Sequence, residues 1–114
     1  MLSTKHKGIL NYIVSYCERI ESVTNGITRD EFDNNLNIRE IVCFNILQIG
    51  ELTKNFEPTF VELYGNQPWK DIKGMRDHVA HGYGSIIWDK VWEVVEKDIK
   101  PLKDYCIQIL KEGN

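Results

Sequence analysis

The sequence has few cysteines and few prolines, three of each, and the cysteines are widely spaced. Cys17, Cys43 and Cys106 are odd in number and form none of the spacings typical of a zinc or redox motif, so no disulfide framework is indicated. Each lies within an apolar helical pattern, where we expect a buried small hydrophobic residue rather than a metal ligand or a nucleophile. This usage favours a reducing, cytoplasmic compartment.

Long hydrophobic runs and an excess of basic residues are also absent. No stretch of about 18 apolar residues occurs, which excludes a spanning helix, and we expect no signal peptide at the amino terminus. The formal net charge is -3 and the pI is near 5.6. These values argue against binding of duplex DNA on a broad basic face, because such binding neutralises many phosphates at once. A small local phosphate site remains compatible with them, and nothing suggests a membrane partner.

The apolar residues recur at spacings of three and four, which is typical of helices. A length of 114 residues fits a single domain, 1–114. The predicted architecture is all-α: an antiparallel four-helix bundle with a short additional helix. The long helices are expected at about Thr4–Val23, Leu36–Phe56, Pro68–Ala80 and Ile86–Lys111, and the short one begins at Pro58.

Local signals support these boundaries. Thr28 and Glu31 have the spacing of a capping box, which starts a short helical turn. Pro101 removes a backbone hydrogen bond from the last helix and should bend it near Asp98. The helix over 36–56 is apolar on nearly every side, which indicates contact with several neighbours or with a second protomer.

The residues best suited to chemistry lie at the carboxyl end of the third predicted helix and directly after it. Arg76, His81 and Tyr83 fall within eight positions, and Gly82 and Gly84 flank the tyrosine. The glycines let the backbone turn, so that the imidazole and the phenol can come back toward the guanidinium. A near-neutral imidazole can take or give a proton, and a planar guanidinium can hold two phosphoryl oxygens. The cluster suits phosphodiester chemistry, and that chemistry requires no metal or other cofactor.

The spacing of Arg76, His81 and Tyr83 resembles the R-x4-H-x-Y signature of the HEPN superfamily, in particular its HepT-like branch. Three further motifs are similar to that branch, and Asp77 is the polar residue expected after the arginine. These motifs are Ile49-Gly50-Glu51, Pro68-Trp69 and Gly74-Met75. The similarity extends over nearly the whole chain.

The resemblance implies a homodimeric helical bundle whose two copies of Arg76 and His81 form one composite cleft. It implies a metal-independent endoribonuclease toxin, encoded beside a minimal nucleotidyltransferase (MNT) antitoxin, with RNA as substrate. By the same resemblance Arg76 would bind the phosphate and His81 would be the acid/base residue. Tyr83 would be the hydroxyl that the partner modifies with adenylyl groups, and Asp77 would orient the arginine or the histidine.

Simpler roles are open for each residue. Arg76 could pair with Glu51 or Asp77, and His81 could interact with the helix dipole at a carboxyl end. Tyr83 could be a packed aromatic residue. Glu51 could be a buried carboxylate paired with Arg76, or a supporting group at the cleft. His78 and His81 could form half of a metal site, but no further ligands cluster in the sequence.

Two functions other than that of a ribonuclease therefore remain open. The chain could be a non-catalytic HEPN binding or scaffold partner of a nucleotidyltransferase, which the acidic net charge favours. It could also be a dimeric helical adaptor without activity.

Overall fold

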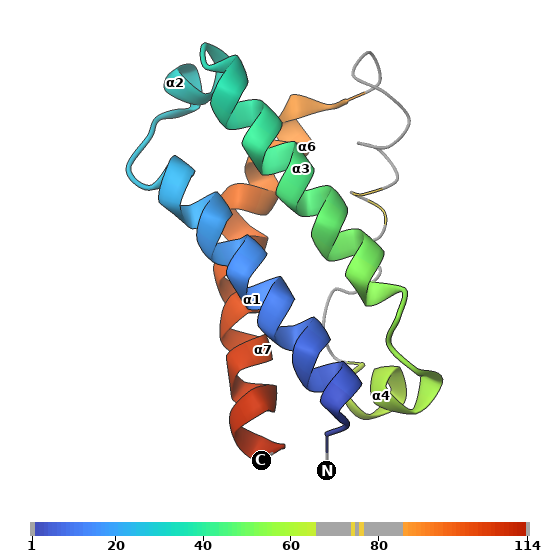
Figure 1. Ribbon diagram of the computed structural model, residues 1–114. Helices are drawn as coiled ribbons and strands as arrows, with labels where there is room; N and C mark the ends of the chain where they lie inside the picture. The colour runs from blue at the N-terminus through green and yellow to red at the C-terminus, as the bar shows by residue number, and fades with distance from the viewer. Residues whose placement is uncertain (1, 66–73, 75, 77–85, 114) are drawn as a thin grey trace.

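The computed structural model describes residues 2–65, 74, 76 and 86–113, and every regular element among them is helical (Figure 1). This confirms the all-α prediction. The described helices are α1 (Thr4–Thr24), α2 (Arg29–Asp33), α3 (Leu36–Thr53), α4 (Pro58–Leu63), α6 (Trp88–Glu93), the π-helical segment η2 (Val94–Asp98) and α7 (Ile99–Glu112). Gly74 and Arg76 are helical, and the rest of the helix predicted over 68–80 lies outside the described residues.

Polar side chains begin the first three helices, and the sequence predicted the cap of the second, α2. Ser3 Oγ accepts a hydrogen bond from the His6 amide at 3.0 Å at the start of α1. At α2 the capping box of Thr28 and Glu31 is complete, with both reciprocal bonds present. Asn35 caps α3 in the same way as Ser3 caps α1. These side chains satisfy amides that have no partner inside the helix, and so they fix where each helix starts.

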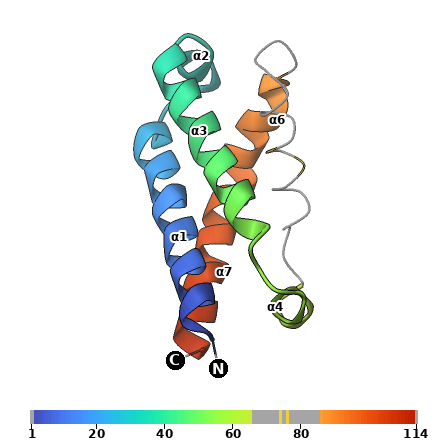
Figure 2. The ribbon, with the colours of Figure 1, turned by 45° about the vertical axis from the view of Figure 1, so that its right-hand side comes forward.

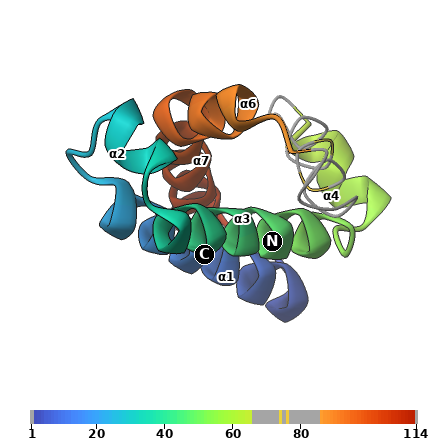
Figure 3. The same cartoon turned by 90° about the horizontal axis from the view of Figure 1, so that it is seen from above.

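Helix α1 packs against both α3 and α7, and this arrangement forms the bundle. It runs antiparallel to both, so that the two chain ends lie at the same end of the molecule (Figures 1 and 2). Seen from above, α6 and α7 lie on one side of the α1–α3 pair (Figure 3). One side of α3 thus faces the core, and another is left without a helix of the described chain against it.

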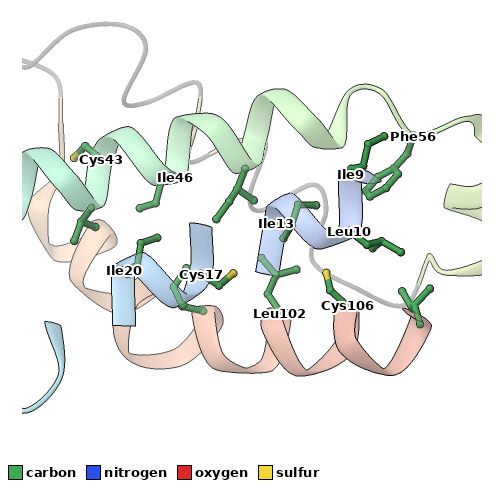
Figure 4. Packing of buried hydrophobic residues seen from close by; sticks show 14 of the residues in the cluster. Ile9, Leu10, Ile13, Cys17, Ile20, Cys43, Ile46, Phe56, Leu102 and Cys106 are labelled. Atoms are coloured by element: carbon green, nitrogen blue, oxygen red, sulfur yellow. The ribbon is translucent and has the colours of Figure 1, made fainter. Parts of the chain in front are cut away.

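The core is mainly aliphatic, with a few phenylalanine and cysteine side chains, and it is closed to solvent. On α1 it is formed by Leu10, Ile13, Cys17 and Ile20, all 0% exposed, at spacings that place them on one face. They meet residues of α7 such as Cys106 (Figure 4). Removing these side chains from water supplies the main stabilising free energy of the bundle.

The three cysteines have the buried role that the sequence predicts. Burial raises the pKa of Cys17 to about 12 and that of Cys43 to about 11. Burial also raises the pKa of Cys106. Because only a thiolate is a good nucleophile or metal ligand, these thiols act as small hydrophobic side chains.

The last predicted helix is interrupted close to the expected place. The five residues of η2 separate α6 from α7, and Asp98 is the residue that precedes α7. Pro101 lies in the first turn of α7, directly after η2, and it lacks the amide that would continue the hydrogen bonds of the helix. The π-helical turn accommodates the proline that an uninterrupted α-helix would exclude.

In the described part of the chain, no helix is both long enough and apolar enough to cross a lipid bilayer.

Candidate functional site

The structure describes two of the five predicted site residues, Arg76 and Glu51. Asp77, His81 and Tyr83 lie outside the described residues. The roles predicted for these three, and the composite cleft of two protomers, therefore stay predictions. The geometry of the candidate site is that of the arginine, the glutamate and their neighbours on α3.

Arg76 and Glu51 form an ion pair, in which the guanidinium Nη2 contacts the carboxylate Oε1. The pairing was one of the alternatives that the sequence left open. The arginine side chain is 24% exposed, whereas that of Glu51 is 48% exposed. Of the two alternatives for Glu51, the buried carboxylate is correct in its partner but not in its burial, because the last turn of α3 directs the side chain to the surface. The hydrogen bond from Arg76 lowers the pKa of Glu51, so the carboxylate is ionised at neutral pH.

The position of Glu51 is electrostatically unusual. It lies in the last turn of α3, where the helix dipole disfavours negative charge, and that turn contains no basic residue. Lys54 follows at the carboxyl end of the helix, and its Nζ lies 3.5 Å from the same Oε1. Two cations thus compensate one carboxylate at this helix end. Sequence reasoning did not single out Lys54, and its only signal was its position three residues after the glutamate.

The exposed side of α3 continues from Glu51 with apolar residues. Phe44 is seven positions earlier, which places it on the same face of the helix, and it is 54% exposed. Ile41 beside it is 39% exposed. The sequence prediction of apolar surface beyond the core of one protomer is confirmed for this face. Large exposed apolar side chains next to one another indicate a contact surface.

A polar side chain that the sequence reasoning missed lies beside this face. Asn45 is buried, and its Nδ2 donates to the Ile41 carbonyl at 2.7 Å. Its Oδ1 has no hydrogen-bond partner among the described residues. A groove of about 580 Å³ borders it, lined by Arg19, Asn37, Glu40, Ile41, Phe44 and Asn45. The signal available in the sequence was one amide within an otherwise apolar stretch of α3.

The described part of the site is suited to holding an anion. A guanidinium offers a planar pair of donors, and an ammonium offers a compact charge that can follow a moving ligand. Together with Glu51 they sum to one positive charge, which matches the single negative charge of a phosphodiester. Among the residues that the structure describes, no three histidine, cysteine or acidic side chains cluster as a metal site would require.

The protein is therefore a small all-α helical bundle with a group of charged side chains at the end of α3. Comparison of its sequence with known families identifies the family. The family model described as "Ribonuclease HepT-like" matches residues 13–109. Because the match covers most of the chain, the protein belongs to the HepT-like ribonuclease family, and the resemblance read from the motifs is confirmed.

Individual relatives agree with that assignment. A Methanocaldococcus jannaschii protein named "Gamma-glutamylcyclotransferase and putative RNase" is 37% identical over 103 residues, which are 90% of this chain and 46% of that protein. A "Putative RNase" of Caldanaerobacter subterraneus is 30% identical, with 90% of this chain and 92% of the relative covered. A "Probable ribonuclease HepT" of Thermococcus cleftensis is 30% identical over 90% of this chain and 93% of its own length. No solved structure matches the chain.

Proposed function

We propose that the protein is a metal-independent endoribonuclease that cleaves RNA with Arg76 and His81. The observation that carries the proposal is the Arg76 guanidinium, held by Glu51 at the exposed end of α3 in a chain of the HepT-like family. The names of the relatives, which include an RNase in each case quoted above, support the same substrate class.

The chemistry follows from the side chains. His81 takes the proton of the RNA 2′-hydroxyl, whose oxygen attacks the adjacent phosphorus while the bond to the 5′-oxygen breaks. A protonated imidazole returns a proton to that leaving oxygen. Arg76 stabilises the negative charge that builds on the phosphoryl oxygens. Two copies of His81, one from each protomer, supply the base and the acid of the same step.

The same proposal makes the active form a homodimer. The exposed Phe44 and Ile41 support it, since they continue the face of α3 that carries Glu51. Burying this apolar surface against its own copy would bring two Arg76–Glu51 pairs toward one axis. Such an interface is self-complementary, and a single protomer would hold half of the catalytic groups.

The biological setting that we propose is a toxin-antitoxin module in the cytoplasm, in which this chain is the toxin. A minimal nucleotidyltransferase antitoxin would attach adenylyl groups to the Tyr83 hydroxyl. The added phosphate and base would fill the cleft beside Arg76 and His81 and exclude RNA. Asp77 would orient the arginine or the histidine.

The test is RNA cleavage by the purified protein in the presence of a chelator, with Arg76→Ala and His81→Ala as variants. Loss of one donor to a developing oxyanion costs about 10²–10³ in rate, and loss of a general acid/base costs about 10²–10⁴. We expect reductions of that size with melting temperatures close to that of wild type, because the partly exposed Arg76–Glu51 pair contributes little to stability. Equal cleavage by all three proteins would disprove the assigned roles.

A second candidate function is a non-catalytic partner of the nucleotidyltransferase, which the net charge of -3 favours. In that case the chain is the substrate of the modification and does not cut RNA. Intact-mass measurement after incubation with the partner and ATP separates the possibilities together with the cleavage assay. Adenylyl additions that disappear in Tyr83→Phe, without any RNA cleavage by the unmodified protein, would favour this second function.

A further inference from the structure

Two cationic side chains converge on one carboxylate oxygen at the end of α3. Lys54 Nζ lies 3.5 Å from Glu51 Oε1, and Arg76 Nη2 contacts the same atom. The carboxylate oxygen therefore marks a point that both cations reach at once. An anionic oxygen of another molecule at that point would receive donors from both side chains.

A purely structural role does not account well for this arrangement. An exposed ion pair contributes little to stability, and a single cation suffices to offset a carboxylate. The other lysine pairs on the described surface have that simple form, for example Lys97 with Glu93 and Lys100 with Asp104. Among ion pairs between described residues, Glu51 is the one carboxylate that two cations contact. It also lies in the last turn of α3, where the helix dipole disfavours negative charge and the two cations offset that effect.

We propose that Lys54 is a second phosphate-binding residue, which acts with Arg76 on the RNA backbone. The inference rests on the proposed ribonuclease function and adds a substrate-binding group to it. In the free protein Glu51 holds both cations in place. When RNA binds, a phosphate oxygen takes the position of Glu51 Oε1, and the half-exposed carboxylate turns toward solvent.

The two cations differ in what they contribute. The planar guanidinium of Arg76 has fixed donor directions and suits the phosphoryl group that reacts. The ammonium of Lys54 is a flexible point charge, and its side chain is 39% exposed, so it strengthens binding of the backbone without fixing the geometry of the reaction. Loss of Lys54 should raise KM and leave kcat nearly unchanged.

The experiment compares wild type with Lys54→Gln, Lys54→Arg and the matched control Lys97→Gln, all as full-length protein. Lys97 is also an exposed lysine beside a glutamate, but on η2. The probe is a short mixed-sequence single-stranded RNA, with KM and kcat measured over a series of salt concentrations. Melting temperatures of all four proteins establish that the folds are equally stable.

We expect Lys54→Gln to raise KM about tenfold at low salt. The plot of log(kcat/KM) against log[salt] has a negative slope. In the variant this slope should be less steep by about 0.7, because the variant neutralises one phosphate fewer than wild type. Lys54→Arg should keep the wild-type KM and the wild-type salt slope, because arginine keeps the positive charge. Lys97→Gln should match wild type. A purely structural Lys54 would shift the melting temperature and leave the salt slope alone.

These measurements also distinguish a failure of the proposed Lys54 role from a failure of the proposed ribonuclease function. If Lys54→Gln equals wild type while Arg76→Ala abolishes cleavage, the role of Lys54 is wrong and the ribonuclease stands. An equal rise in KM in Lys54→Gln and Lys97→Gln would also overturn the role of Lys54, since it would indicate a general effect of charge. If wild type neither binds nor cleaves the RNA, both proposals fall.

Discussion

The two sides of α3 differ in exposure and in charge. On one side Val42 and Ile46 are 0% and 2% exposed and pack within the core that α1 and α7 complete. On the other, Phe44 is 54% exposed and leads to the charged group of Glu51, Arg76 and Lys54. The first side has the composition that folding requires. The second exposes apolar surface to water and carries an acidic group in the last turn of the helix, where only its cationic partners Arg76 and Lys54 offset the unfavourable helix dipole.

This difference indicates that the exposed side of α3 is kept for contact with other molecules. A helix that served the fold alone would be polar there. The comparison can be tested by changing one side at a time.

The largest effect is expected on the core side. Ile46→Ala should lower the free energy of unfolding by about 2–5 kcal/mol, because it leaves a cavity among packed neighbours. Ile41→Ala is the matched control, with the same residue type on the same helix but 39% exposed instead of 2%. Its effect on the monomer should be small, as measured by urea denaturation at low protein concentration. Equal losses in the two variants would mean that the two sides do not differ in stability.

The next effect concerns association. Phe44→Asp should weaken the proposed dimer, because burying each of its two copies of this phenylalanine stabilises by about 1.5–3 kcal/mol, or about 10- to 100-fold in the dissociation constant per copy. Sedimentation equilibrium measures the constant directly. Leu63→Asp on α4 is the control, since Leu63 is also exposed but lies outside this face.

An unchanged dimer in Phe44→Asp, or a dimer broken equally by Leu63→Asp, would rule out the exposed side of α3 as the interface. A wild-type protein that stays monomeric at every concentration would rule out the dimer itself.

The smallest effect concerns the pH dependence of stability. Arg76 lowers the pKa of Glu51 in the folded protein below its ordinary value. A lowered carboxyl pKa adds stability above the ordinary pKa, and that stability is lost as the pH falls through the folded value. Melting curves of wild type and Glu51→Gln should therefore differ most near neutral pH and converge in acid.

A double variant supplies the control for this pH effect. In an Arg76→Ala background, Glu51→Gln should change the pH dependence less, because the main partner of the carboxylate is gone. If the pH dependence of Glu51→Gln is the same in both backgrounds, Arg76 is not what lowers the pKa of Glu51.

Much of the fold could be predicted because it depends on local patterns. The boundary at Thr28 follows from a capping box, and the start of α4 at Pro58 follows from the fixed φ of proline. Both signals act within one helical turn. The π-helical form of η2 was less accessible, since Pro101 predicts an interruption but not which backbone geometry relieves it.

The site was predicted in its residue types better than in its environment. The motif around Arg76 indicated a phosphate-binding group, and the pairing with Glu51 was one of the stated alternatives. The exposure of Glu51 and the approach of Lys54 were not predicted. The approach of Lys54 is a local contact between residues three positions apart, whereas the meeting of both cations at Glu51 depends on where α3 ends relative to the helix that carries Arg76.

The sequence by itself determined that the chain is helical, where most of its helices begin, and that the cysteines are buried, because these properties follow from spacing and from local hydrogen bonds. Only the tertiary structure decided that Arg76 and Lys54 meet at one oxygen of Glu51, and that Phe44 stays in solvent beside them. The packing of α1 between α3 and α7 sets which side of α3 is covered. This packing leaves the side of α3 with Phe44 and Glu51 exposed. Which side is covered could not be predicted from the pattern of any single helix, because it depends on contacts between helices.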